Sequence, residues 1–369
     1  MNILLQPVRN VVLSLVVGIL ALLGMVSTAN AQGGGIPEGP VHTRPGLINP
    51  TCASWGADRV DCFLVGNNGR MYHTWSDVAS SGDFRDFAPW QDELGAPPAG
   101  FDLRGGMGVT AWGPNRLDIM AITEDGHVAH RYWNGSSWQP ANWEDLDRPG
   151  QAGVSEIGCT TWGVNRIDCF ARGMDRHVYQ LAWGGTSWNW VDMGPLPTGT
   201  AGDNDSLGVA AAAYQSTLLY QLVVGIDGNV YHSKWNGTTW SAWVNGGKPT
   251  STNLMNVTCQ AGVIYVMDCV FLDVSGAVWH RSYYENVGSW LSWHNLGALA
   301  PGVNAYYAGG LGFSKVVGDY GAMYVMAYGE NGQIYLGFGR GSTSTFDWYG
   351  WDNLGRPKDQ HQFLPLVRR

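Results

Sequence analysis

The chain has 369 residues, of which 14% are charged, and its formal net charge at pH 7 is −9. It contains only four lysines, so it lacks the clustered Lys and Arg side chains that nucleic acids and anionic membrane surfaces require. Gly (52 residues) and Trp (19 residues) are abundant, whereas a long helical protein would be rich in Ala, Leu, Glu and Lys. This composition predicts tight turns between aromatic-rich β-strands.

Residues 1–31 are predicted to be a signal peptide. Arg9 precedes an apolar run at residues 11–24, and Ala29-Asn30-Ala31 offers a cleavage site before Gln32. The run is shorter than the roughly 20 apolar residues that span a bilayer, although an uncleaved anchor is the alternative. We therefore expect a secreted protein, extracellular or periplasmic, with no membrane insertion after cleavage.

Six copies of one unit follow the signal peptide. The clearest copies are CASWGADRVDCFLVGNNGRMYHTW (52–75), VTAWGPNRLDIMAITEDGHVAHRYWNGSSW (109–138) and CTTWGVNRIDCFARGMDRHVYQLAWGGTSW (159–188), and weaker ones lie at 218–240, 263–290 and 322–339. Each copy closes on a tryptophan before a short polar or Gly-rich exit: Trp90, Trp143, Trp190, Trp243, Trp293 and Trp351. Six similar units of this length indicate one tandem-repeat domain rather than separate sandwiches, which need about 100 residues each.

Within a unit the pattern predicts four short strands. In the third copy, residues 159–162 form the first strand, 163–166 a turn, 167–172 the second strand and 177–183 the third. Gly-containing turns then lead to a fourth strand that carries the closing Trp. Radially repeated four-stranded units are the blades of a β-propeller. The predicted fold is all-β, a propeller of six four-stranded antiparallel blades at residues 50–355.

The repeated pattern W-G-x-N-R-[IL]-D, followed by a D-G turn and then Y-H-x-x-W, resembles the repeat of the PLL-like β-propeller lectins. These are secreted bacterial proteins that bind fucose and related sugars, so the resemblance implies a sugar-binding propeller. It covers residues 50–355 and is strongest in the second and third copies. The family typically closes with seven blades; here a Gly/Pro-rich lead (32–49) and a tail or closing strand (356–369) could jointly complete a thin seventh, but we expect six.

Six cysteines repeat a C-x9-C spacing in copies 1, 3 and 5. In a secreted chain this spacing predicts disulfides rather than a zinc site, which would need closer pairs. If the hairpin centre lies at Val164, Cys159 faces Cys169 and Trp162 faces Arg166. The predicted bonds are Cys52–Cys62, Cys159–Cys169 and Cys259–Cys269. In copy 2 an apolar pair, Val109 and Ile119, stands at the matching positions.

Catalytic motifs are not evident in the sequence. Neither H-E-x-x-H nor G-x-S-x-G occurs, and no glycine-rich phosphate loop is found. Aspartates recur at one repeat position, which favours a scaffold role in bonding turn amides or the neighbouring arginines: Asp61, Asp118, Asp168 and Asp268. The histidines lie in different blades, too far apart to share one metal ion. We expect no cofactor and no metal, with a divergent glycan hydrolase as the less favoured alternative.

Aromatic and polar side chains on the third strand suggest carbohydrate recognition instead. Flat rings match the C–H faces of sugars, Arg and His hydrogen-bond hydroxyls, and repetition adds avidity. The candidate sugar-binding residues are Arg59, His73, Trp75, Arg116, His130, Trp133, Arg166, Tyr179, Trp183, His232 and Trp235. The same rings could instead fill the space between blades, as we expect for the closing tryptophans. The expected partners are cell-surface glycans, and a protein-binding adhesion or scaffold role is the alternative.

Overall fold

The computed structural model describes residues 50–66, 70–77, 85–95, 103–197, 207–214, 218–262, 265–306, 309–316, 321–342 and 345–355. The predicted signal peptide (1–31), the lead (32–49) and the tail (356–369) lie outside these described residues. Within the described residues every regular element is a strand, and no helix there is long and apolar enough to cross a membrane.

The strands form six antiparallel sheets in chain order. The first three sheets contain β1 (Thr51–Gly56), β2 (Arg59–Val65) and β3 (Met71–Asp77); β4 (Leu103–Thr110), β5 (Leu117–Thr123), β6 (Val128–Trp133) and β7 (Trp138–Asp145); and β8 (Val154–Gly163), β9 (Arg166–Gly173), β10 (His177–Trp183) and β11 (Trp188–Pro195). The last three contain β12 (Val209–Tyr214), β13 (Leu218–Val224), β14 (Val230–Trp235) and β15 (Val244–Gly247); β16 (Leu254–Ala261), β17 (Val266–Asp273), β18 (Val278–Tyr284), β19 (Ser289–Trp290) and β20 (His294–Asn295); and β21 (Leu311–Lys315), β22 (Ala322–Tyr328), β23 (Ile334–Ser342) and β24 (Thr345–Gly355).

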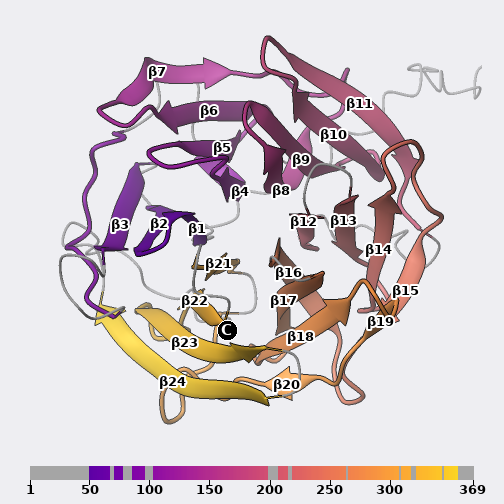
Figure 1. Cartoon of the computed structure of the whole chain (residues 1–369). Helices are drawn as coiled ribbons and strands as arrows, with labels where there is room; N and C mark the ends of the chain where they lie inside the picture. Colours follow the sequence, from indigo (N-terminus) through magenta and orange to yellow (C-terminus); the bar gives the residue numbers. More distant parts are fainter. Residues whose placement is uncertain are drawn as a thin grey trace, which may run out of the picture. The chain divides into compact units, whose positions relative to one another are not determined.

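The six sheets are arranged as a ring, with the first strand of each sheet at the centre (Figure 1). Successive first strands contact one another, and β1 contacts β21, so the last sheet meets the first. Each sheet uses strands consecutive in the chain. The prediction of a six-bladed propeller is therefore confirmed, and we number blades 1 to 6 in chain order.

Two outer edges depart from the regular four-strand pattern. In blade 1 the fourth strand is reduced to isolated bridges, His73 with Gln91 and Ser76 with Phe87. In blade 5 the outer strand is divided into β19 and β20, which both pair with β18. An edge strand has a neighbour on one side only, so its interruption leaves the inner three strands of the blade paired.

Apolar side chains fill the space between each pair of neighbouring blades. Each interface has its own cluster, and each cluster includes the closing tryptophan of the later blade: Trp90, Trp143, Trp190, Trp243, Trp293 and Trp351. Two of these rings also donate across the interface, Trp190 Nε1 to the Leu146 carbonyl at 3.0 Å and Trp351 Nε1 to the Leu296 carbonyl at 3.1 Å. The predicted core role of the closing tryptophans is confirmed.

Three disulfides link the first and second strands of blades 1, 3 and 5, as predicted: Cys52–Cys62, Cys159–Cys169 and Cys259–Cys269. The paired cysteines are directly opposite in register, with Cα atoms 4.0 to 4.1 Å apart. One detail of the predicted hairpin was wrong. Gly163, and not Trp162, faces Arg166, because the register shifts between Thr161 and Gly163. The bulged backbone leaves Trp162 without a cross-strand partner.

The alternation of disulfides has a packing counterpart in the blades between them. Each disulfide belongs to the cluster shared with the preceding blade, where the first strand carries a very small residue. A Cβ added to Gly108 would lie 2.5 Å from Cys159 Sγ, and one added to Gly312 would lie 2.8 Å from Cys52 Sγ. Ala210 holds the same register position in blade 4 and is buried in one cluster with Cys259. Each disulfide thus faces a Gly or Ala on the first strand of the preceding blade.

Candidate functional site

An arginine and an aspartate two residues apart begin the second strand of blades 1 to 3. Residues i and i+2 of a strand point to the same face, so the two side chains meet. Arg59 donates to Asp61 through Nε (3.0 Å to Oδ2) and Nη2 (2.8 Å to Oδ1). The equivalent pairs are Arg116–Asp118 and Arg166–Asp168. All three carboxylates are fully buried and the arginines are partly exposed, so the predicted pairing of the repeated Asp with its Arg is confirmed.

Aromatic rings hold the guanidinium groups in place. The Arg59 guanidinium carbon lies 5.4 Å from the centre of the Trp55 ring and 5.0 Å from that of Trp75. Around Arg116 the rings are Trp112 at 5.2 Å and Tyr132 at 3.8 Å. Cation–π contact and the bidentate carboxylate together fix a planar group of hydrogen-bond donors, partly exposed, at the interface with the next blade.

Blade 3 keeps only half of this arrangement. Arg166 lies 4.9 Å from the Trp162 ring, but Ala182 is opposite Asp168, where blades 1 and 2 have an aromatic residue. The Arg166 side chain is accordingly more exposed, at 37% against 22% for Arg59. Trp162 partly replaces the missing aromatic residue, because its ring lies beside Arg166 and its Nε1 donates to the Asp168 carboxylate.

A buried histidine links two carboxylates in blade 1. His73 Nε2 lies 2.9 Å from Asp61 Oδ1 and its Nδ1 lies 2.6 Å from Glu93 Oε1. Trp138, from blade 2, donates through Nε1 to the same Glu93 oxygen at 3.1 Å. Burial lowers the pKa of His73, but hydrogen bonds and charge from Asp61 and Glu93 outweigh it and raise the pKa above 6.5. The hydrogen bond from His73 lowers the pKa of Glu93.

Blade 2 repeats the same chain of contacts. His130 Nε2 lies 3.1 Å from Asp118 Oδ1, and Nδ1 lies 3.0 Å from Glu144 Oε2. The Trp188 ring of blade 3 packs edge-on against the imidazole, 5.1 Å away. Burial again lowers the pKa of His130, but its bonds to Asp118 and Glu144 raise it overall, while the His130 bond lowers the pKa of Glu144.

Blade 3 has a glutamine at the histidine position. Gln180 Nε2 donates to Asp168 Oδ1 at 2.6 Å, and the residue opposite on the outer strand is Val191 rather than a carboxylate. Blade 3 therefore has the Arg–Asp pair without a titrating partner on its third strand.

Blades 4 to 6 carry different chemistry at these positions. The strand register places Leu218, Val266 and Ala322 where the arginines stand, and Tyr220, Asp268 and Tyr324 where the aspartates stand. Asp268 pairs with Lys315 of blade 6 at 2.5 Å and with His280 at 3.0 Å. Burial would raise the pKa of Asp268, but the Lys315 charge and the His280 bond lower it.

An ion pair and a hydrogen bond join blades 4 and 5 at the equivalent interface. Lys234 Nζ lies 2.8 Å from Glu285 Oε1, and the Tyr220 hydroxyl donates to the other Glu285 oxygen. His232 has no acidic partner there, and burial together with the Lys234 charge lowers its pKa to about 4. Among the predicted residues, His232 thus stands apart from His73 and His130.

The predicted tryptophans of the third strand do not share one face. Trp75 lies beside Arg59, whereas Trp133, Trp183 and Trp235 stand one register position further along, opposite Leu117, Ile167 and Leu219. They therefore face the preceding blade, where they contact the first tryptophan of their own outer strand. These pairs are Trp133–Trp138, Trp183–Trp188 and Trp235–Trp240, with ring centres 5.3 to 5.8 Å apart.

Each of these interfaces consequently combines the Arg–Asp pair of one blade with tryptophans of the next. Trp133 packs into the cluster between blades 1 and 2, and Trp183 into the cluster between blades 2 and 3. The structure does not bring Tyr179 to the Arg166 cleft face, because it is one residue from Gln180. Its hydroxyl donates to Asp175 at 2.5 Å, and burial with that bond raises its pKa.

Three kinds of site residue escaped the sequence prediction: the carboxylates Glu93 and Glu144, the aromatic residue Tyr132, and the outer-strand rings Trp138 and Trp188. A signal for the carboxylates exists in the sequence, since Glu93 and Glu144 each follow a closing tryptophan within three residues. Their contact with a histidine on another strand depends on irregular outer-strand register, which the sequence pattern does not encode.

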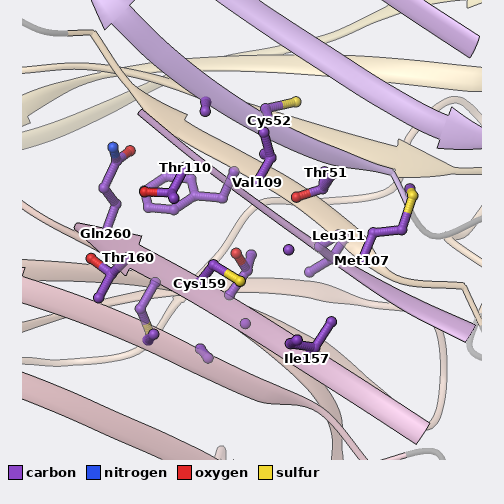
Figure 2. A pocket seen from close by; sticks show the side chains of 18 of the residues that line it. Thr51, Cys52, Met107, Val109, Thr110, Ile157, Cys159, Thr160, Gln260 and Leu311 are labelled. Carbon is purple, nitrogen blue, oxygen red and sulfur yellow. The ribbon is translucent and has the colours of Figure 1, made fainter. Parts of the chain in front are cut away.

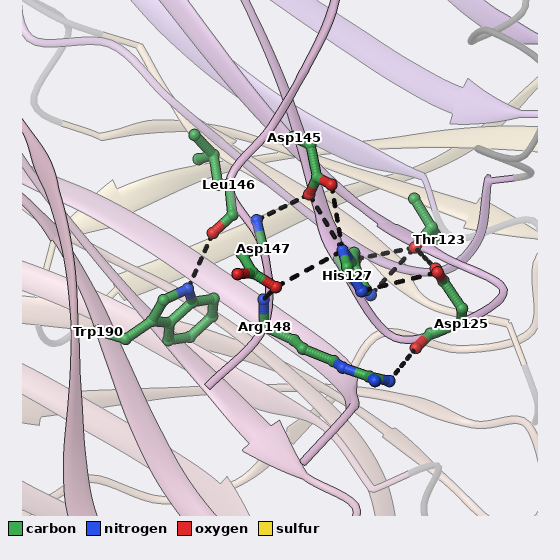
Figure 3. Close-up of polar contacts among 8 residues, drawn as sticks. All are labelled: Thr123, Asp125, His127, Asp145, Leu146, Asp147, Arg148 and Trp190. Atoms are coloured by element: carbon green, nitrogen blue, oxygen red, sulfur yellow. Dashed lines mark hydrogen bonds and ion pairs between the residues drawn. The ribbon is translucent and has the colours of Figure 1, made fainter. Parts of the chain in front are cut away.

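A second histidine sits at the β5–β6 hairpin of blade 2 (Figure 3). His127 lies 3.2 Å from Asp145, with Asp125 at 3.7 Å and Asp147 at 3.8 Å, and Arg148 bonds the Asp125 carbonyl. These side chains are more exposed than the cleft histidines. In the described part of the chain no group of His, Cys, Asp or Glu side chains could hold a metal ion.

The central channel encloses a cavity of about 130 Å³, lined by the first strands of all six blades. Figure 2 shows hydroxyl and sulfur groups around it, including Thr51, Thr110, Thr160 and Cys159. Of the described residues that line it, Glu156 alone is charged. The Arg–Asp interfaces of blades 1 and 2, with an arginine, an aspartate, a histidine and a glutamate each, therefore carry more charged groups than the channel.

No protein-family model and no curated protein matches the chain. Solved structures do match. A mutant Aleuria aurantia lectin in complex with Fucalpha1-6GlcNAc has a TM-score of 0.62 at 13% identity, over 84% of this chain and 97% of its own. AofleA from Arthrobotrys oligospora has a TM-score of 0.62 at 10% identity, over 85% and 88%.

A lectin from Burkholderia pseudomallei has a TM-score of 0.54 at 17% identity, over 83% of this chain and 99% of its own. The Aleuria aurantia lectin is itself a six-bladed β-propeller that recognises fucose. At these identities the similarity establishes the fold, and in fold this chain is similar to six-bladed propellers that include fucose-binding lectins.

Proposed function

We propose that this protein is a secreted, multivalent lectin that binds glycans of a cell surface at three clefts and carries out no catalysis. The clefts are those between blades 1 and 2, 2 and 3, and 3 and 4. The observation that carries the proposal is the partly exposed arginine fixed by a buried aspartate and an aromatic ring, in three consecutive blades.

This arrangement suits a neutral sugar. The bound guanidinium presents donors to sugar hydroxyls, half-buried rings offer a flat apolar face, and Glu93 and Glu144 offer acceptors. Positioned in advance, these groups lose little conformational entropy on binding. Fucose and related sugars are the favoured class, since the repeat resembles that of the PLL-like lectins and the structural neighbours include fucose-specific lectins.

The proposal includes cleavage after residue 31 and delivery outside the cytoplasm. Three disulfides support it, because such bonds persist in oxidising compartments. The buried aspartates are neutralised by arginine, which supports binding over hydrolysis, since glycosidases need a pair of working carboxylates.

A glycan array followed by calorimetry tests the proposal. Fucose, galactose or a methylated sugar should bind with a stoichiometry of up to three. The triple variant Arg59→Ala, Arg116→Ala, Arg166→Ala should lose binding by at least about tenfold, equivalent to roughly 1.4 kcal/mol per site. Lys248→Ala is the control, because Lys248 contacts Asp227 and Asn253 in blades 4 and 5, away from the three proposed clefts.

Trp75→Ala provides a second variant that leaves the buried Asp61 paired with Arg59, and it should weaken one site only. Melting curves of each variant separate loss of binding from loss of fold. If the wild-type chain bound no glycan on the array, the lectin proposal would be rejected and a protein-binding scaffold favoured. Release of reducing sugar from a glycan would instead favour a hydrolase.

A further inference from the structure

The histidines of the first two clefts each bridge two carboxylates that come from different strands. His73 on β3 contacts Asp61 on β2 and Glu93 beyond the blade edge, and the Trp138 ring covers it from blade 2. The charged groups in contact with His73 are these two acids, and Arg59 is bound to Asp61. Arg131 of blade 2 also lies at this interface, where its guanidinium donates to the Leu94 and Trp138 carbonyls. His130 has the corresponding groups Asp118, Glu144, Arg116 and the Trp188 ring, but Leu181 of blade 3 stands where blade 2 has Arg131.

An imidazole can donate to two carboxylates only while it carries both protons. After it loses one proton, a nitrogen lone pair faces a carboxylate oxygen at about hydrogen-bonding distance, and that contact becomes repulsive. The raised pKa values of His73 and His130 have this origin. One of the two carboxylates must then be released as the pH rises.

The two carboxylates are not equally free to move. Asp61 is fully buried and accepts from both Nε and Nη2 of Arg59, whereas the Glu93 side chain is 40% exposed and has one neutral donor besides His73, Trp138 Nε1. The contrast is the same in blade 2, where Asp118 is fully buried and Glu144 is 43% exposed. The released group is therefore the glutamate, the more exposed of the two carboxylates.

We propose that His73 and His130 are positioning residues, which hold Glu93 and Glu144 as ordered acceptors for sugar hydroxyls only while the imidazoles are doubly protonated. Binding at the first two clefts then weakens as the pH rises, and binding at the third does not. The third cleft has Gln180 in place of histidine and no carboxylate opposite it. This inference rests on the proposed lectin function and adds a pH response to two of its three sites.

Single-cleft variants test this directly. Arg116→Ala with Arg166→Ala leaves the first cleft, and Arg59→Ala with Arg116→Ala leaves the third. Calorimetry with the array-selected sugar at about pH 5.5 and about pH 9, either side of the ordinary histidine pKa, should show about tenfold weaker binding at the higher pH for the first cleft. A loss of one charge-assisted hydrogen bond corresponds to this factor. The third cleft should change less than about twofold.

His73→Gln in the first-cleft variant is the conservative replacement, because Gln180 of blade 3 reaches Asp168, the aspartate equivalent to Asp61. It should bind equally at both pH values, at the weaker level of the wild-type first cleft at about pH 9, because a glutamine that donates to Asp61 leaves Glu93 without its histidine donor. NMR titration should show a higher pKa for the His73 ring with sugar bound than without it, because sugar binding favours the state in which doubly protonated His73 holds Glu93. Equal pH profiles in the first and third clefts, or a profile unchanged in His73→Gln, would overturn the inference. Absence of binding at either pH in all clefts would instead overturn the lectin proposal itself.

Discussion

At the scale of single residues, the buried histidines and the glutamate bound to one of them make the free energy of unfolding depend on pH in opposite directions. The raised pKa values of His73 and His130 mean that their protonated forms stabilise the folded state below about pH 6.5, the pKa of an unfolded histidine. This contribution is lost as the pH rises through the raised values. The lowered pKa of Glu93 adds stability above about pH 4.5, which is lost as the pH falls through the lowered value.

Replacement of both bridging histidines should therefore flatten the alkaline side of the stability profile. We expect His73→Gln with His130→Gln to remove the decline in the free energy of unfolding between about pH 6.5 and pH 9. Urea unfolding at a series of pH values measures it. His177→Gln is the control, because His177 lies on the blade surface beside Asp192. A double variant with the same alkaline decline as the wild-type chain would contradict the assignment.

His232 acts in the other direction. Its pKa of about 4 lies below the unfolded value, so the unfolded chain binds the proton more readily between about pH 6.5 and pH 4. Stability should fall by about 3 kcal/mol over that interval, at 1.36 kcal/mol per pKa unit. His232→Gln should remove this loss, and acid unfolding followed by circular dichroism checks it. An unchanged acid limb would show that another group carries the proton uptake.

At the scale of strands and hairpins, packing opposite the disulfides makes a sharper prediction. Because a Cβ at Gly108 would lie 2.5 Å from Cys159 Sγ, Gly108→Ala should destabilise the protein by about 1–3 kcal/mol, as overpacked cores do. Cys159→Ala with Cys169→Ala should cost no more than about 3 kcal/mol, since the closed loop is short. Combining the three changes should cost less than the sum, because removal of sulfur makes room for the methyl group.

Denaturant unfolding of the wild-type chain, Gly108→Ala, the double cysteine variant and the combined variant measures that coupling. Val109 and Ile119 show what an apolar pair does at the matching positions of blade 2, so Cys159→Val with Cys169→Ile is the matched control and should fold. Strict additivity of the Gly108 and cysteine changes would contradict the packing account of the alternating disulfides.

The same scale shows which features the sequence could predict. The cysteine register follows from counting along a hairpin, and it proved correct although a bulge displaced Trp162. The register shift is confined to the turn side of Thr161, so every pair from Thr161–Ile167 to Cys159–Cys169 keeps the predicted register. The tryptophans of the third strand did not follow as easily. Trp75 and Trp133 look equivalent in a loose repeat, but one residue of offset puts their rings on opposite faces. Glu93 depends on the irregular edge of blade 1, where no strand period applies.

At the scale of the whole ring, the number of copies decided the fold because each copy buries its apolar faces only against its neighbours. The six interface clusters, including the one that joins blade 6 to blade 1, share one composition of strand apolars and a closing Trp. Six copies thus suffice to close the ring. The choice of ligand groups follows a different pattern, because it depends on a few partly exposed residues at the edges of the clusters, such as Arg59 and its counterpart Leu218.

The Arg–Asp pairs are distributed unevenly around the ring, so its two halves differ. The disulfides repeat in every second blade, but the arginines occupy three neighbouring blades, and blades 4 to 6 have no arginine at that position of the second strand. If the three clefts bind sugar, the molecule contacts a glycan-covered surface through the half of the ring that holds these clefts, and the other half of the ring makes no contact with that surface. It would then rest tilted on that surface rather than flat, with its second half directed outward and open to another contact.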